Sequence, residues 1–268
     1  MLDAAEVERR TGWRTVAHAV VASTNDEAAV LRDAGVGPRV VVVADRQLAG
    51  RGRGGRRFAS PEGGLYASLL VSVRVADLPA PVTAAVVTAL AEAVEARVPV
   101  AVAIKWPNDL WIGRRKVAGI LTEASFGGGG AVVRAAIVVG VGVNLAGVPG
   151  DLEPEVAAAT TALDLHAPAP VRREDLLAEF LPRLERRLAE LERPPTRAAL
   201  EAAYRARLAL RGERVRFFVG DATAEGTLVD ASLDEGLLVR DAAGTDRWWA
   251  AGLVREVRAV EEPPMIRR

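Results

Sequence analysis

The sequence predicts an α+β fold in two parts: a domain of residues 1–210 that mixes helices and strands, and a small all-β domain of residues 211–268. Three observations support this prediction. The 268 residues are 50% hydrophobic, which is enough to bury a large and a small core. Residues 1–210 alternate β-branched runs with segments of helical periodicity. After Gly212, turn residues separate five short runs within about 55 residues, a pattern typical of a small β-barrel.

The N-terminal elements are a short helix over residues 3–10, a strand over 13–21 and a helix over 26–34. Ser23 or Thr24 is suited to cap this second helix, because a hydroxyl accepts a hydrogen bond from the free N–H groups of the first turn. The cap does not explain the neighbouring Asn25. A strand buried on both faces is expected next, and its sequence is the all-valine run 40–43.

The middle of the chain is predicted to be mostly β. A strand over 65–75 precedes a helix over 82–97, whose apolar residues recur with a period of 3.6. The remaining elements are a strand over 100–104, a hairpin of 111–112 and 116–123 closed at Gly113-Arg114, a glycine turn at 127–130 and a strand over 131–143.

The C-terminal part begins with a segment, 144–171, whose sequence has no clear pattern. An amphipathic helix over 172–192 should stop at Pro194-Pro195, and Thr196 is suited to cap a helix running to about 209. The five short strands of the predicted barrel are 214–219, 224–231, 236–241, 245–250 and 252–259.

Composition excludes several classes of function. Lys plus Arg balances Asp plus Glu at 35 each, so no overall field attracts nucleic acid or a membrane. The chain has no cysteine, which excludes disulfides and thiolate metal ligands, and the two histidines, His18 and His166, make a histidine triad or zinc site improbable. The start, MLDAAEVERR, does not resemble a signal segment, and the apolar run 135–143 is too short to span a bilayer. A cytoplasmic protein is expected.

Lysine and the carboxamides are rare in this chain and fall in short polar motifs. Only Lys105 and Lys116 are lysines among the 35 basic residues. A lysine offers a compact ammonium that approaches a single oxygen end-on, which an arginine fork does not. An Asn or Gln supplies donors and an acceptor without charge, as a neutral polar ligand requires. The carboxamides are Gln47, Asn25, Asn108 and Asn144.

A glycine- and arginine-rich loop follows the valine strand. Gly50, Gly52 and Gly55 match the G-x-G-x-x-G pattern, but the sequence after them does not open a helix that could hold a pyrophosphate, so we reject a dinucleotide site. Glycine N–H groups and guanidinium forks together suit an anion, and the loop should order when that anion binds. The alternative is a solvated basic loop or an RNA-binding tract. Its arginines are Arg51, Arg53, Arg56 and Arg57.

Four polar motifs in this order resemble the biotin protein ligases. The resemblance covers nearly the whole chain, and its third motif is highly specific. It implies a mixed-sheet catalytic domain similar to class II aminoacyl-tRNA synthetases, followed by an SH3-like barrel. The motifs are Ser23-Thr24-Asn25; Gln47 with Ala49-Gly50-Arg51-Gly52-Arg53; Lys105-Trp106-Pro107-Asn108-Asp109 with Lys116-Val117-Ala118-Gly119-Ile120-Leu121; and Gly140-Val141-Gly142-Val143-Asn144.

The resemblance also implies roles for individual residues. Lys116 would be the catalytic lysine that bridges the biotin carboxylate and the α-phosphate, assisted by Arg51 and Arg53. Asp109 would hold Mg²⁺. The implied biotin-binding residues are Ser23, Thr24, Asn25, Gln47, Gly50, Arg51, Arg53, Lys116 and Gly119. The implied ATP-binding residues are Arg53, Arg56, Phe58, Lys105, Asn108, Asp109, Lys116 and Asn144.

The implied reaction has two steps: biotin and ATP form biotinyl-5'-adenylate, and biotin then passes to a lysine of the biotin carboxyl carrier protein or domain of acetyl-CoA carboxylase or a related carboxylase. No DNA or membrane partner is expected, and a homodimer is left open. Two positions depart from the pattern. Phe58 stands where the family often has Trp, and the phosphate-binding arginine of the C-terminal domain is either Arg255 or Arg258. A lipoate-type ligase and an RNA-binding protein are the alternatives.

Overall fold

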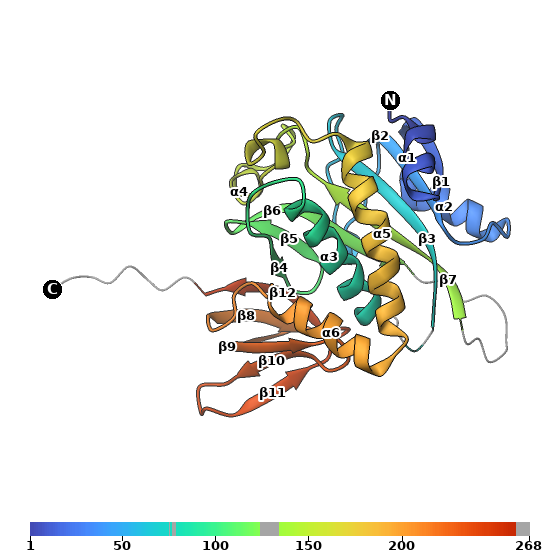
Figure 1. Cartoon of the computed structure of the whole chain (residues 1–268). Coiled ribbons are helices and arrows are strands. Elements are labelled where there is room, and N and C mark those ends of the chain that lie inside the picture. Colours follow the sequence, from blue (N-terminus) through green and yellow to red (C-terminus); the bar gives the residue numbers. More distant parts are fainter. Residues whose placement is uncertain (75, 77–78, 124–133, 261–268) are drawn as a thin grey trace.

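The computed structural model describes residues 1–74, 76, 79–123 and 134–260. Its N-terminal part is built on a seven-stranded mixed sheet with the order β1-β2-β3-β7-β6-β5-β4 (Figure 1). β1 and β2 are parallel, and the other neighbours are antiparallel. The strands are β1 (Arg14–Val21), β2 (Val40–Gln47), β3 (Leu65–Arg74), β4 (Ala103–Lys105), β5 (Asp109–Ile112), β6 (Arg115–Glu123) and β7 (Arg134–Val143).

Helices cover both faces of this sheet. Helices α1 (Ala4–Thr11), α3 (Ala80–Glu95) and α5 (Arg173–Leu191) lie on one face, and α2 (Thr24–Asp33) lies on the other. Successive side chains of a strand point to opposite faces. Accordingly, Val41 and Val43 belong to the large core, whereas Val40 and Val42 pack with Ala28 of α2. The predicted burial of the valine run on both faces is confirmed.

The C-terminal strands form a second sheet with the order β11-β10-β9-β8-β12. Its pairings within the described residues leave it open, with β11 and β12 at its edges, so closure into a barrel stays a prediction. The elements are α6 (Pro194–Arg205), β8 (Arg214–Val219), β9 (Ala222–Ser232), β10 (Gly236–Arg240), β11 (Asp246–Trp249) and β12 (Val254–Ala259).

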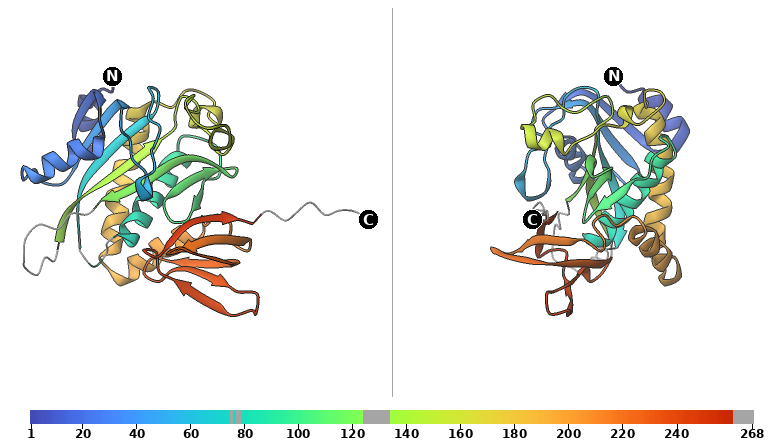
Figure 2. Two further views of the ribbon diagram at one scale, coloured as in Figure 1. Left: turned by 180° about the vertical axis from the view of Figure 1, so that it is seen from behind. Right: turned by 90° about the vertical axis from the view of Figure 1, so that its left-hand side faces the viewer.

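The segment that leads from α6 to the C-terminal sheet is hydrogen-bonded to β4 of the large sheet. Ile104 N–H donates to the carbonyl of Arg207 at 2.7 Å, and Ala209 N–H donates to the carbonyl of Ile104 at 2.9 Å. Both views of Figure 2 place the C-terminal sheet beside this end of the large one. The hydrophobic core runs on from Leu208 into Phe217 and Leu228. The domain boundary at residue 210 therefore stays a prediction.

Most predicted elements are confirmed within a few residues; two predictions need correction, and two others lie outside the described residues. The strand expected over 100–104 is only Ala103–Lys105. Helix α6 begins at Pro194, not at Thr196, because proline fits the first helical turn, where its missing N–H group has no partner to lose. The turn at 127–130 and the start of the strand at 131–133 are not described.

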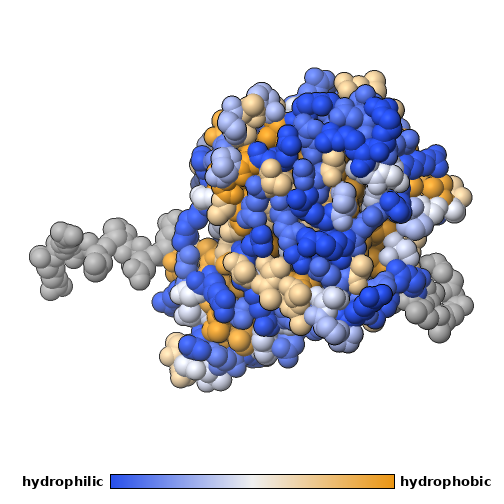
Figure 3. Space-filling model, in the orientation of Figure 1, coloured by the Kyte–Doolittle hydropathy of each residue, from blue (hydrophilic) through white to orange (hydrophobic). Residues whose placement is uncertain are grey.

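Two short helices in the segment 144–171 had no signal in the sequence: α4 (Pro154–Ala158) and a 3-10 helix (Leu163–Leu165). The face that carries α5 in Figure 1 is largely hydrophilic, with scattered apolar residues (Figure 3). Among the described residues, no helix has the length and apolar character needed to cross a membrane.

Candidate active site

A cavity of about 650 Å³ opens over the ends of α2 and β2, the arginine loop, β5, β6 and β7. This volume is in the range of small-molecule sites. Its lining has two chemically different ends. The amide end consists of Ser23, Thr24, Asn25 and Gln47, and the cationic end consists of Arg53, Arg56, Lys105, Lys116 and Arg258.

The amide end is organised around Gln47, the last residue of β2. Its Oε1 accepts hydrogen bonds from Thr24 N–H at 2.8 Å and from Thr24 Oγ1 at 3.0 Å, and its Nε2 donates to Ser60 Oγ at 2.9 Å. Ser68 Oγ lies 2.7 Å from Thr24 Oγ1 and 2.5 Å from Asn25 Oδ1. Ser23, Thr24 and Asn25 are buried. These contacts fix the polar groups before any ligand arrives.

Ser23 caps α2, accepting from Asn25 N–H at 3.3 Å, so the capping role is confirmed. Asn25, which the cap did not require, lines the amide end and connects Ser68 to Glu123. Its Nδ2 donates to Glu123 Oε2 at 2.6 Å. Gly140 of β7 makes room for it, because a Cβ at Gly140 would lie 2.4 Å from Asn25 Oδ1.

Gly142 of β7 makes room for the ring of Phe58, as Gly140 does for Asn25. A Cβ at this position would lie 2.5 Å from the ring of Phe58. The ring therefore lies directly on the backbone of β7, and Lys116 Nζ is 5.6 Å from its centroid. Phe58 thus presents an aromatic face to the cavity.

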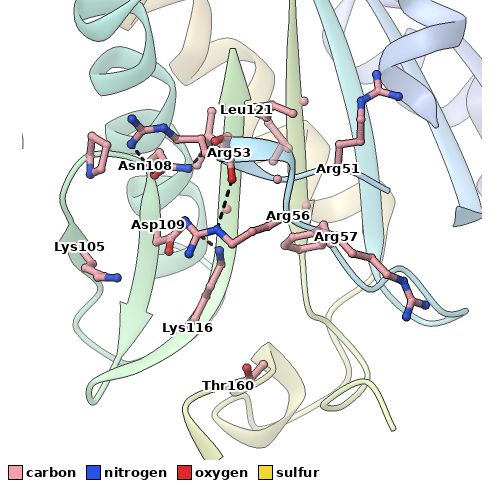
Figure 4. Close-up of a pocket in the computed structure, with 18 of the residues that line it drawn as sticks. Arg51, Arg53, Arg56, Arg57, Lys105, Asn108, Asp109, Lys116, Leu121 and Thr160 are labelled. Atoms are coloured by element: carbon pink, nitrogen blue, oxygen red, sulfur yellow. Dashed lines mark hydrogen bonds and ion pairs between the residues drawn. The ribbon is translucent and has the colours of Figure 1, made fainter. Parts of the chain in front are cut away.

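Lys116 is held at the cationic end by Asp109. Its Nζ donates to Asp109 Oδ1 at 2.8 Å (Figure 4). Gly119 leaves room for the ammonium, since a Cβ there would lie 2.9 Å from Nζ. Two backbone hydrogen bonds fix the main chain of Lys116. Its N–H donates to the carbonyl of Ala159 at 2.8 Å, and its carbonyl accepts from Thr161 N–H at 2.8 Å.

The cations at this end perturb one another. Burial lowers the pKa of Lys105, and the nearby charges of Lys116, Arg258 and Arg56 lower it further against the opposing effect of Asp109. Burial also lowers the pKa of Arg53. A site that desolvates and crowds positive charge is suited to bind a polyanion.

Asn108 and Arg53 connect the central motif to the loop. Asn108 Nδ2 donates to the carbonyl of Ile120 at 2.7 Å, and its Oδ1 accepts from Arg53 at 3.5 Å. Arg56 in turn donates to the carbonyl of Arg53 at 3.3 Å. The arginine loop is thereby tied to the β5–β6 hairpin.

Two of the four loop arginines pair with carboxylates outside the loop, and the ordering of the loop on anion binding stays a prediction. Arg51 pairs with both oxygens of Asp26, at 2.6 and 2.9 Å, and lowers the pKa of that carboxyl. Arg57 pairs with Asp151 at 2.6 Å. Both point away from Lys116, whereas Arg56 points toward it and Arg53 points toward Asn108 (Figure 4). Residues 59–64 form no helix, in agreement with the rejection of a dinucleotide site.

Two residues predicted for the site do not line this cavity. Asn144 is buried, and its Nδ2 donates to the carbonyl of Thr161 at 3.1 Å, so its amide has a structural task. Gly50 is needed for close packing, because a Cβ there would lie 2.5 Å from the carbonyl oxygen of Phe58. The other predicted residues line the cavity.

Some polar residues of the lining were not predicted from the sequence. Glu155 and Thr160 come from the 144–171 segment, and Glu256 comes from β12. Arg258 lines the cavity, whereas Arg255 donates to the carbonyl of Gly220 elsewhere. The geometry thus favours Arg258 over Arg255 as the arginine that the C-terminal sheet contributes.

The donor set for a metal ion is small. No cluster of three His, Cys, Asp or Glu side chains occurs among the described residues. Asp109, the carboxylate beside Lys116, fits Mg²⁺ as one ligand among phosphate oxygens and water, which is how proteins usually hold this ion with nucleotides.

A neutral hydrogen-bonding end and a cationic end in one cavity are what a ligase that activates a small carboxylic acid with ATP would need, and the comparisons place the chain in such a class. The model of the biotin/lipoate A/B protein ligase family matches residues 18–144. The chain is 37% identical over 235 residues to the biotin–[acetyl-CoA-carboxylase] ligase of Paracoccus denitrificans, covering 83% of this chain and 92% of the relative. It is 34% identical over 260 residues to that of Mycobacterium tuberculosis, covering 92% and 91%.

Among solved structures, the biotin protein ligase of Aquifex aeolicus in complex with biotin and ATP superposes with a TM-score of 0.78 at 25% identity. The match covers 92% of this chain and 99% of that one. The chain belongs to the biotin protein ligases.

Proposed function

We propose that the protein activates biotin with ATP as biotinyl-5'-adenylate, releases pyrophosphate, and transfers the biotinyl group to a lysine of a biotin carboxyl carrier domain. The observation that carries this proposal is that one cavity holds both the amide end and the cationic end, with Lys116 in its lining. Two of the relatives bear the name biotin–[acetyl-CoA-carboxylase] ligase, which supports the carboxylase as the acceptor.

The amide end matches the ureido ring of biotin. That ring has two N–H donors and one carbonyl acceptor, and burying them without partners costs a few kcal/mol. Thr24, Asn25 and Gln47 offer hydroxyl and amide groups at fixed positions, because hydrogen bonds among them and Ser68 hold them in place. A lipoyl dithiolane would leave these groups unpaired, so the amide end favours biotin over lipoate.

The cationic end matches the first chemical step. The biotin carboxylate attacks the α-phosphorus of ATP, so two anions approach each other, and preorganised cations offset their repulsion. Lys116 contacts both anions in this proposal, with Arg51 and Arg53 of the loop beside the carboxylate and phosphate. Asp109 would hold Mg²⁺ with the phosphates, and the ion would neutralise charge on the phosphoryl oxygens.

The nucleotide is proposed to extend from Lys116 toward Lys105 and Arg258. Arg56 and Asn108 face the same region, and Phe58 supplies an aromatic surface. The proposal keeps the adenylate away from water by means of the arginine loop, because a mixed anhydride hydrolyses readily. Asn144 would act through the backbone around Lys116, since its N–H donates to the carbonyl of Val117 at 2.9 Å.

The finer architecture is part of the same proposal. Residues 211–268 would form an SH3-like domain behind a catalytic domain of residues 1–210, and the enzyme would act in the cytoplasm. The hydrogen bonds between Ile104 and residues 207 and 209 support a C-terminal domain that is fixed next to Lys105.

One experiment tests the proposal directly. Purified protein is incubated with Mg-ATP and either biotin or lipoate, and pyrophosphate release and acyl-adenylate are measured. We expect release with biotin only, followed by transfer when a carrier domain is added. Release with lipoate instead of biotin would support a lipoate-type ligase, and no release with either acid would contradict the proposal.

A further inference from the structure

Strand β12 of the C-terminal sheet has a β-bulge at the edge of the cavity. Arg255 pairs with Phe218 and Arg258 pairs with Arg216, so that Glu256 and Val257 together face one residue of β8. Glu256 has a φ of 54°, in the left-handed region that favours glycine. Bulges redirect side chains and are common beside active sites. Here both residues of the bulge line the cavity: Val257 is buried, and Glu256 is partly exposed and carries the charge.

The carboxylate of Glu256 contacts two cations. Its Oε1 lies 3.6 Å from Arg56 of the arginine loop, and its Oε2 accepts from Arg258 at 2.9 Å. The same two arginines act on Lys105, whose pKa their charges help to lower. Glu256 therefore lies where positive charge is concentrated, and it links the C-terminal sheet to the loop of the N-terminal part.

We propose that Glu256 is a positioning residue that takes the place of a nucleotide phosphate in the empty enzyme, holding Arg56 and Arg258 at the cationic end until the triphosphate displaces it. This inference rests on the proposed function, because it assumes that ATP phosphates bind there. The carboxylate repels the incoming phosphates and must move away from the two arginines. Glu256 therefore has two effects: it lowers the affinity for ATP, and it holds the arginine loop in place before ATP binds.

The test compares Glu256→Gln with Glu225→Gln. Glu225 is the matched control: it lies in the same sheet, accepts from Arg214 and Arg216, and does not line the cavity. In Glu256→Gln the KM for ATP should fall roughly three- to tenfold, since a like charge beside the phosphates is removed. The KM for biotin should not change. Protease should cut residues 49–58 of the ligand-free variant faster than those of the wild type.

A second variant guards against a folding defect. Glu256→Gly also removes the carboxylate, and glycine suits the positive φ, so the bulge should be retained. Both variants should bind ATP more tightly, and Glu225→Gln should match the wild type. An unchanged KM for ATP in both would overturn the proposal in favour of a surface ion pair. A raised KM would also overturn it, because Glu256 would then assist the nucleotide or its metal ion.

Direct binding of inorganic triphosphate, measured by calorimetry, separates this inference from the proposed function. If the wild type releases no pyrophosphate with biotin, the proposed function fails, but the calorimetric comparison still applies. Tighter triphosphate binding by Glu256→Gln than by the wild type supports the role of Glu256 as a resident anion. Equal or weaker binding by the variant contradicts it.

Discussion

The amide end and the cationic end belong to one cavity, yet they prepare for a ligand in opposite ways. At the amide end, Thr24, Asn25 and Gln47 are bonded to one another through Ser68 and backbone groups. At the cationic end, burial of Lys105 and the charges of Lys116, Arg258 and Arg56 lower the pKa of Lys105. The first end is ordered by its own hydrogen bonds without a ligand, whereas the second keeps Lys105 buried among cations whose effect on its pKa Asp109 does not fully offset.

This difference indicates what each end contributes. Groups that are fixed in advance distinguish one neutral ring from another, because a wrong ring leaves buried polar atoms unpaired. Crowded cations supply little shape discrimination but a strong attraction for phosphates, and they stabilise developing negative charge. Substitutions at the two ends should therefore have different effects, and the following predictions separate them.

The largest expected effect is that of Lys116→Arg. The charge is kept, but the guanidinium is bulkier than the ammonium, and Gly119 and Asp109 leave little space around Nζ. Biotin-dependent pyrophosphate release should fall by roughly 10² or more, as when one oxyanion donor is removed. The melting temperature should barely change, because the contact of Lys116 with Asp109 lies in the cavity and not in the core. Both quantities are measured on the same sample.

Arg115→Lys is the control for that variant, since Arg115 is the exposed neighbour on the same strand. It should release pyrophosphate at the wild-type rate. If Lys116→Arg is equally active, Lys116 has no direct contact with the reacting groups and the comparison of the two ends loses its main support.

A smaller and more selective effect is expected for Gly140→Ala. The new Cβ would lie 2.4 Å from Asn25 Oδ1, so Asn25 must move away from Ser68 and Glu123. The KM for biotin should rise roughly tenfold, about the value of one hydrogen bond to a buried group. The KM for ATP should stay near the wild-type value. Steady-state kinetics with each substrate varied in turn measure both.

Gly142→Ala is the matched variant on the same strand, because its Cβ would displace the ring of Phe58 instead. It should raise the KM for ATP more than the KM for biotin. Gly37→Ala, where no atom lies within 4 Å of the new Cβ, should affect neither. An equal loss for both substrates in Gly140→Ala and Gly142→Ala would mean that the two ends are not independent.

The sequence predicted the chemistry of the site better than its geometry. Rare lysines and carboxamides identified Lys116 and Gln47, because their side-chain chemistry is visible in the sequence. The tasks of Gly140 and Gly142 could not be predicted, since they depend on which side chains cross β7 from α2 and the arginine loop. Glu256 and Thr160 were missed for a related reason. The strand that carries Glu256 was predicted but its bulge was not, and Thr160 follows a short helix in a segment without a clear pattern.

The fold shows the same limit. Periodicity predicted the helices and most strands, because α3 and β2 carry strong apolar patterns. The sheet order and the attachment of residues 207–209 to β4 are non-local, and no local pattern encodes them. The assignment of Asn144 to the nucleotide, made from its motif, stays a prediction, and the bond of its amide to Thr161 is a structural role that the motif did not reveal.

The smallest expected effect concerns stability. Burial and neighbouring cations lower the pKa of Lys105, so its charged form opposes folding of the ligand-free protein. Lys105→Met removes that charge and keeps the apolar stem. The melting temperature of the ligand-free protein at neutral pH should rise by roughly 2 °C, a shift that about 0.5 to 1 kcal/mol produces in a chain of this size. The KM for ATP should rise, because the same charge attracts phosphate.

The lowered pKa of Lys105 also predicts how the difference in stability between Lys105→Met and the wild type changes with pH. Because the pKa of Lys105 is lower in the folded state, the unfolded chain holds more protons in the window between the folded and unfolded values, and wild-type stability rises with pH there. The advantage of Lys105→Met is therefore full below the folded pKa and shrinks as pH increases through the window, where the wild-type amine is already neutral. Thermal unfolding of both proteins across alkaline pH measures this difference, with Arg115→Met as an exposed-cation control that should give no such trend. If Lys105→Met is less stable than the wild type at neutral pH, the charge of Lys105 stabilises the ligand-free protein. The cationic end would then carry no free-energy cost of buried charge, and this difference from the amide end would not exist.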